Sequence, residues 1–303
     1  MTNLPKATLG RTGLEVTKLG YGAMELRGAS RGRELDANQV ETVLNGVLDA
    51  GINFIDTSID YGESEELIGR YISHRRDEYY LATKCGCPLG EFEWSGRGGV
   101  PHVFTRDHII AGVEQSLTRM RTDYIDLLQF HASPSIEELE EHQAIETLQE
   151  LKREGKIRFI GASSTLPNLA SHIEMGVFDA FQIPYSALER QHEETITQAA
   201  ESGAGIILRG GVARGAPSDG KQRGNRWGLW QRASLDELLD GMTRMEFILR
   251  FTLSHPALST TIVGTVNPDH LAANLDALVA GPLPLDLYDE AKRRLTAAES
   301  EAE

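Results

Sequence analysis

The stretch GINFIDTSIDYG, residues 51–62, places polar groups at the end of an apolar run. Ile52, Phe54 and Ile55 predict a buried strand over residues 52–56. Asp56 ends that strand, and Asp60 and Tyr61 follow in the turn. A carboxylate at this point could simply cap the next helix. The alternative is that the strand delivers Asp56 to a functional site.

Similar runs recur along the chain, and each is followed by a segment with helical periodicity. In the first such segment Val40, Val43, Leu44 and Val47 share one face. Two later segments repeat the pattern with Ile109, Val113, Leu117 and Met120, and with Leu271, Leu275 and Leu278. Besides residues 52–56, strands are predicted at 19–23, 79–83, 125–130, 157–161, 179–183, 204–208 and 260–264.

Local signals mark the ends of several predicted helices. Asp36 stands where an N-cap is expected before the first helix. Ser234 and Glu237 have the spacing of a capping box. Gly155 follows Lys152 and Arg153 and predicts a helix stop.

Eight strand–helix units without a strong linker favour parallel strands joined by right-handed crossovers. We therefore predict an α/β fold, a (β/α)8 TIM barrel that spans residues 1–303 as one domain. An open doubly wound sheet is the alternative, but no G-x-G-x-x-G follows the first strand. Residues 6–18 predict a hairpin around Arg11-Thr12-Gly13 that would plug the amino-terminal end of the barrel.

Two connections are longer than the others, at residues 85–104 after the third strand and 209–233 after the seventh. In a (β/α)8 barrel these loops lie on the carboxyl-terminal face, where active sites are built. Disordered insertions are the alternative interpretation. As walls of a substrate pocket, the loops would contribute Trp94, Trp227 and Trp230.

Composition limits the partners and the compartment. The formal net charge of −15 argues against nucleic acid or an anionic membrane as a partner. No run approaches the roughly 18 apolar residues of a membrane span, and the first residues do not have a signal-peptide pattern. We expect a cytoplasmic protein with Cys85 and Cys87 as reduced thiols. No tight His/Cys spacing is present, so a metal site is not expected.

Four polar groups fall at three successive strand ends. Asp56 and Tyr61 follow the second strand, Lys84 ends the third and His131 ends the fourth. Each alone has a structural explanation, but together they suit general acid catalysis. A lysine would lower the pKa of tyrosine from its usual value near 10, and an aspartate would hold the lysine charged. A histidine could then orient a carbonyl oxygen.

The sequence resembles the aldo-keto reductase family over nearly its whole length. The resemblance rests on GINFIDTSIDYGESEELIG (51–69), LATK (81–84), DYIDLLQFH (123–131) and PDHLAANL (268–275). It implies a (β/α)8 barrel that binds a nicotinamide cofactor across its carboxyl-terminal face. It also implies that Tyr61 is the proton donor, that Lys84 and Asp56 tune it, and that His131 orients the carbonyl. Asp60 matches no family role and is expected to be a solvated turn residue or a local pocket charge.

The resemblance further implies a set of cofactor contacts. Ser164 stands where the family usually has asparagine, and Arg209 stands where an aromatic residue usually stacks on the nicotinamide. A planar guanidinium can also stack on a ring, and next to an oxidised, cationic nicotinamide it would be repelled, which would favour the reduced cofactor. The implied contacts are Gly22, Ala23, Met24, Ser163, Ser164, Gln182, Arg209, Gly210, Gly211, Gly264, Thr265, His270 and Asn274.

The resemblance implies NADPH as the cofactor. NADH is the alternative, because His270 and Asp269 stand where NADPH-selective members carry basic residues. Lys221, Arg223 and Arg226 could supply the missing charge, or could be an ordinary solvated stretch. The expected activity is reduction of an aldehyde, ketone or sugar carbonyl. A regulatory nicotinamide-binding protein resembling potassium-channel β-subunits, or a barrel isomerase acting on a phosphosugar, is the alternative. The physiological substrate and the oligomeric state stay open.

Overall fold

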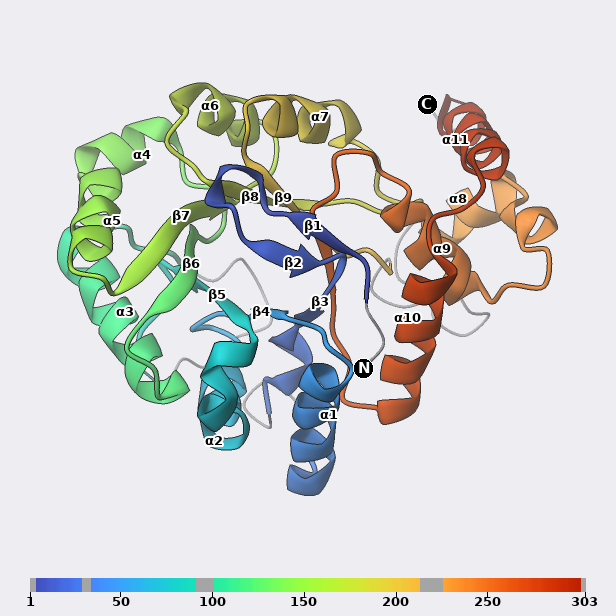
Figure 1. Cartoon of the computed structure of the whole chain (residues 1–303). Coiled ribbons are helices and arrows are strands. Elements are labelled where there is room, and N and C mark those ends of the chain that lie inside the picture. The colour runs from blue at the N-terminus through green and yellow to red at the C-terminus, as the bar shows by residue number, and fades with distance from the viewer. Residues whose placement is uncertain (1–3, 29–33, 91–100, 213–225, 301–303) are drawn as a thin grey trace.

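The computed structural model describes residues 4–28, 34–90, 101–212 and 226–300. Eight parallel strands close into a barrel in the order β10-β3-β4-β5-β6-β7-β8-β9, and helices surround it (Figure 1). The predicted (β/α)8 barrel is therefore confirmed. Among the described helices, none has the length and the apolar character needed to cross a membrane.

All eight predicted barrel strands are present, with ends shifted by at most a few residues. Just before β4, the side chain of Asn53 accepts from Thr17 N in the hairpin. The strands are β3 (Leu19–Gly22), β4 (Phe54–Asp56), β5 (Tyr80–Cys85), β6 (Ile125–Phe130), β7 (Ile157–Ser163), β8 (Ala180–Pro184), β9 (Gly205–Arg209) and β10 (Thr260–Val263).

The helices bury the faces that their periodicity predicts. In α1 the side chain of Asp36 accepts from Gln39 N, and Gly155 follows α5 with φ +79°, as the cap and stop signals predict. The α-helices are α1 (Ala37–Asp49), α2 (Ser64–Tyr71), α3 (Arg106–Met120), α4 (Ile136–Glu141), α5 (Ala144–Arg153), α6 (Asn168–Met175), α7 (Glu193–Glu201), α8 (Arg226–Arg232), α9 (Arg244–Leu253), α10 (Pro268–Ala280) and α11 (Leu285–Ser300).

The capping-box prediction at Ser234 is wrong. Ser234 adopts the left-handed conformation (φ +49°), makes no side-chain cap, and precedes a short 3-10 helix, Leu235–Leu238. A capping residue needs an extended backbone, which Ser234 lacks. The long connection after β9 also contains α8, so part of the predicted loop is helical.

The predicted hairpin consists of β1 (Lys6–Thr8) and β2 (Glu15–Thr17), which lie across one end of the barrel (Figure 1). Leu9 and Val16 pack onto the interior residues Phe54, Ala82, Leu127, Ala180 and Ile207. The guanidinium of Arg11 donates to the backbone carbonyls of Gly176, Ser202 and Gly203. The hairpin thus closes the amino-terminal end of the barrel, and the opposite end is left for the site.

Candidate active site

The barrel interior changes from apolar to polar along β4, β5, β6 and β8. Side chains two residues apart point to the same side of a strand. Two residues after each of four apolar interior residues, a polar side chain therefore points into the barrel. The apolar residues are Phe54, Ala82, Leu127 and Ala180. Those polar residues are Asp56, Lys84, Gln129 and Gln182, and each is at most 1% exposed.

Asp56 is the centre of this polar layer. Its Oδ2 lies 2.7 Å from Lys84 Nζ, which also donates to the carbonyl of Thr57 at 2.7 Å. Its Oδ1 accepts from Gln129 Nε2 at 2.8 Å and from Gln182 Nε2 at 2.7 Å. A buried charge needs such compensation. Gln129 was not predicted as a site residue, although its position two residues after Leu127 was a usable signal.

Lys84 is held in its charged form. Burial disfavours the ammonium, but the carboxylate of Asp56 and other neighbouring groups outweigh it and raise the pKa of Lys84. Its Nζ lies 4.8 Å from the centroid of the Tyr61 ring. The prediction that Asp56, Lys84 and Tyr61 come together is therefore consistent with the geometry.

Tyr61 behaves differently from the expectation of a lowered pKa. Burial raises its pKa, the ammonium of Lys84 opposes that rise, and the carboxylates of Asp56 and Asp60 add to it. Burial is the largest of these effects. In this structure Tyr61 is thus a protonated phenol beside a cation.

His131 follows β6 and lies opposite Tyr61, with the ring centroids 6.2 Å apart and the planes at 83°. Burial lowers its pKa to about 3, although the charge of Asp60 works in the other direction. The ring is therefore neutral at pH 7. The two residues after it, Ala132 and Ser133, both have positive φ (65° and 57°), a conformation that side chains rarely adopt outside functional or tightly constrained turns.

Asp60 has two sequence-based interpretations, a solvated turn residue or a local pocket charge, and its position favours the second. Its side chain is only 10% exposed, and its Oδ1 lies 3.7 Å from His131 Nδ1. The hydroxyl of Ser58 donates to the same oxygen at 2.6 Å. Asp60 thus adds a carboxylate to the site.

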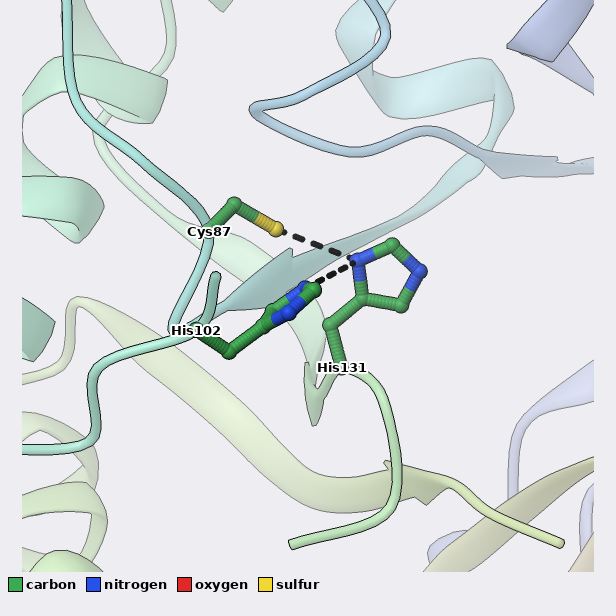
Figure 2. A group of neighbouring side chains, drawn as sticks. All are labelled: Cys87, His102 and His131. Atoms are coloured by element: carbon green, nitrogen blue, oxygen red, sulfur yellow. Dashed lines mark hydrogen bonds between the residues drawn. The ribbon is translucent and has the colours of Figure 1, made fainter. Parts of the chain in front are cut away.

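Both cysteines are free thiols, as expected. Cys87 lies together with His102 and His131 (Figure 2). The three residues are far apart in sequence, so spacing alone gave no signal.

The serines after β7 have different surroundings. Ser163 donates to Gln182 Oε1 at 3.4 Å on the polar layer. Ser164 is fully buried and lies 2.8 Å from His172 Nδ1 and 2.9 Å from Ser133 Oγ. One hydroxyl has a single proton and two lone pairs, so these two contacts occupy much of its capacity. Ser163, which is slightly exposed and makes one such contact, is thus better placed than Ser164 to meet a ligand's amide.

The carboxyl end of β9 brings Arg209 to the same rim, close enough for its charge to act on His131. Gly210 has φ +74°, and a Cβ on Gly211 would lie 2.4 Å from Thr261 Oγ1. A side chain at Gly211 would therefore collide with β10, which explains the glycine at this position.

The rim continues through β3 and β10. A Cβ on Gly264 would lie 2.4 Å from the carbonyl of Gly22, so these two backbones touch. Thr265 is buried, and its Oγ1 accepts from Asn267 N at 3.0 Å just before α10 begins. Around them Ala23 is buried, Asn274 is half-buried, and Met24 and His270 are exposed.

The three tryptophans predicted to line the substrate pocket differ in their positions. Trp94 lies outside the described residues, as do Lys221 and Arg223. Trp227 is half-buried under the guanidinium of Arg244, 4.6 Å from its ring centroid. Trp230 is fully buried against Phe247 and donates to Asp236 Oδ1 at 3.0 Å, so its surroundings are those of a core residue. We therefore withdraw Trp230 from the predicted substrate pocket.

The fold and this site define a (β/α)8 barrel whose carboxyl-terminal rim holds a buried Asp–Lys pair with a tyrosine and a histidine beside it. Residues 18–293 match the model of the "Aldo/keto reductase family". The chain therefore belongs to the aldo/keto reductase family of oxidoreductases, whose members bind nicotinamide cofactors.

Individual relatives agree with this assignment. The chain is 30% identical to "Uncharacterized oxidoreductase YqkF" of Bacillus subtilis over 90% of each chain. The structure of aldo-keto reductase AKR11C1 from Bacillus halodurans, in its holo form, superposes with a TM-score of 0.83 at 30% identity and covers 96% of each chain. A rice protein named "Probable voltage-gated potassium channel subunit beta" is 25% identical over 91% of each chain.

Proposed function

We propose that this protein is an NAD(P)H-dependent reductase of an aldehyde, ketone or sugar carbonyl. The observation that carries the proposal is the buried Lys84–Asp56 pair beneath the ring of Tyr61. A lysine and an aspartate at about 1% exposure are costly to bury, and burying them next to a tyrosine serves proton transfer better than packing.

Tyr61 would donate the proton to the carbonyl oxygen. Its raised pKa keeps the phenol protonated before the reaction. When the proton leaves, the phenolate is stabilised by the ammonium of Lys84, whose Nζ lies 4.8 Å from the ring centroid. Asp56, held by Gln129 and Gln182, keeps that ammonium in place.

His131 would orient the substrate. A neutral imidazole can donate one N–H to a carbonyl oxygen without adding a full charge, and its lowered pKa keeps it neutral at pH 7. Tyr61 and His131 face each other nearly at right angles. A carbonyl oxygen between them could therefore meet both polar groups.

The residues at the rim suit a nicotinamide nucleotide. The reduced nicotinamide, when bound, supplies the hydride that reaches the carbonyl carbon as Tyr61 gives up its proton. Ser163 and Gln182 would hold the carboxamide, and Arg209 would stack on the ring. The Gly22–Gly264 contact and the start of α10 give backbone amides close access to phosphate groups. NADPH is the expected cofactor, with NADH as the alternative.

The second candidate is a regulatory nicotinamide-binding subunit. It is favoured by the 25% identity to the rice channel-subunit relative. The complete Asp56–Tyr61–Lys84–His131 set favours the enzyme, because cofactor binding alone does not need a proton donor.

The test is a steady-state assay that follows consumption of NADPH and of NADH by absorbance against a panel of aldehydes, ketones and aldoses. Cofactor binding is measured in parallel by fluorescence titration. We expect binding of at least one cofactor together with turnover of some members of the panel. Tight cofactor binding without turnover of any carbonyl would overturn the proposal in favour of the regulatory subunit.

A further inference from the structure

We propose that Cys87, His102 and His131 form a binding site for one thiophilic divalent cation of the Zn²⁺ class. Cys87 follows β5, His131 follows β6, and His102 lies on the segment that leads to α3. One ligand atom from each lies within 4.8 Å of the other two. A thiolate with two imidazoles is a donor set that suits Zn²⁺.

Backbone contacts bring these three residues together before any ion is considered. Val103 N donates to the carbonyl of Gly86 at 2.9 Å, which places His102 beside Cys87. His131 N donates to the carbonyl of Cys85 at 3.2 Å, which holds the ends of the two neighbouring strands in register. The ring of His102 also stacks on Phe104, with centroids 6.2 Å apart and planes at 14°. The ligands are therefore positioned by the fold.

Two of the three ligand–ligand distances are close to those around a tetrahedral ion. Cys87 Sγ lies 3.1 Å from His131 Nδ1, and His102 Nε2 lies 3.3 Å from the same nitrogen. Zn–S bonds of about 2.3 Å and Zn–N bonds of about 2.0–2.1 Å would separate tetrahedral ligand atoms by about 3.3–3.6 Å. Only movements of tenths of an ångström are needed along these two edges.

Hydrogen bonds alone do not satisfy this group well. Figure 2 shows both contacts converging on one ring nitrogen of His131, while the other ring nitrogen points away. A single ring nitrogen has either one proton or one lone pair, so it cannot be well matched to two neighbours at once. A cation would accept a lone pair from each residue, and the thiol proton would be released to solvent.

The surroundings add charge that favours a cation. Asp60 Oδ1 lies 3.7 Å from His131 Nδ1, and Ser58 Oγ lies 3.3 Å from Cys87 Sγ. The ammonium of Lys84 and the guanidinium of Arg209 oppose a cation, but Lys84 is paired with Asp56. Three protein ligands leave a fourth position for water or for a substrate oxygen.

The test uses the full-length chain after chelator treatment, with Co²⁺ as the spectroscopic probe. We expect one equivalent of Co²⁺ to bind with a thiolate-to-cobalt charge-transfer band, and Zn²⁺ to displace it. Cys87→Ala should abolish the band, whereas Cys85→Ala should keep it, because Cys85 contributes no ligand atom. Failure of wild-type protein to develop the band, or its persistence in Cys87→Ala, would overturn the site.

A second pair of variants covers the case in which the buried cysteine variants do not fold. His102 lies at a half-buried loop position. His102→Gln should weaken Co²⁺ binding by at least roughly 10–100-fold, which is the loss of metal affinity caused by mutating residues that only hydrogen-bond to the ligands. His74→Gln, at an exposed position, should leave the affinity unchanged. Equal Co²⁺ affinity in these two variants would contradict the proposal. The spectroscopic readout does not depend on the proposed carbonyl reduction.

Discussion

At the scale of single residues, the buried Lys84–Asp56 pair is costly to form. Both side chains are 1% exposed, and the ions lie 2.7 Å apart. Taking two charges out of water costs several kcal/mol each, and only close pairing with extra hydrogen bonds offsets it. Gln129 and Gln182 supply those bonds to Asp56.

Removal of the lysine should therefore destabilise the fold strongly. Lys84→Met leaves Asp56 buried without a cation, and we expect a loss of about 3–5 kcal/mol in the free energy of unfolding. Lys152→Met is the matched control, because Lys152 is 43% exposed in its pair with Asp179. Such a surface pair contributes about 0–1 kcal/mol. Urea denaturation measures both, and equal losses would contradict this account of the polar layer.

The proposed catalytic set could be predicted from the sequence because Asp56, Lys84 and His131 lie at strand ends, where parallel strands converge, and Tyr61 follows in the turn after β4. Gln129 was missed because strand ends were considered without the two-residue alternation behind them. The direction of the Tyr61 pKa was also missed. It depends mainly on the burial of the phenol, which only the three-dimensional arrangement shows.

At the scale of elements, the connection from β5 to α3 depends on Gly86. Its φ is +87°, and a Cβ there would lie 2.2 Å from Phe104 Cε1. Phe104 in turn packs edge-on against Phe130 of β6, with centroids 5.7 Å apart. The glycine therefore lets the returning segment lie close against the strand end that bears Cys87.

Gly86→Ala should lower the free energy of unfolding by more than the left-handed backbone conformation alone would cost. Gly155→Ala is the matched control, since Gly155 also has positive φ (+79°), but a Cβ there would meet no atom within 4 Å. Both variants carry the backbone cost of about 1–2 kcal/mol, and Gly86→Ala adds overpacking of about 1–3 kcal/mol. Chemical denaturation gives the difference. Similar losses for the two variants would show that the contact with Phe104 relaxes freely.

Elements with strong periodicity were predictable, and those set by tertiary contacts were not. All eight barrel strands and the first helix follow from apolar patterns and from the cap at Asp36. The 3-10 helix after Ser234 and the helix α8 follow instead from packing, because Trp230 is buried against Phe247 and Leu235 is fully buried. The meeting of His102 with Cys87 depends on one backbone hydrogen bond across a loop.

At the scale of the whole molecule, two effects compete as the pH falls. The net charge of −15 becomes smaller in magnitude, which reduces self-repulsion in the folded state. Burial, however, lowers the pKa values of His172, His192 and His255. The raised pKa of Glu65, caused by burial, acts in the opposite direction to the histidines, from the ordinary range of carboxyl groups upward.

We expect the histidines to dominate between about pH 7.5 and pH 5.5. Below the ordinary histidine pKa of about 6.5, the unfolded chain binds protons that the folded chain excludes, so stability is lost as the pH falls. Each such histidine contributes at most about 1.4 kcal/mol per pH unit. Urea denaturation at both pH values measures the change, which should shrink in His172→Asn but not in His74→Gln. Greater stability at the lower pH would contradict the prediction.

The central claim is that Tyr61 gives its proton to the substrate oxygen. The most direct measurement is the rate of a single turnover of Tyr61→Phe with saturating reduced cofactor and a carbonyl substrate identified in the panel assay. Tyr71→Phe, a half-buried tyrosine at the end of α2, is the control. The account predicts that Tyr61→Phe lowers the rate by about 10²–10⁴-fold with cofactor affinity unchanged, while Tyr71→Phe reacts normally. Full single-turnover activity in Tyr61→Phe would contradict the account.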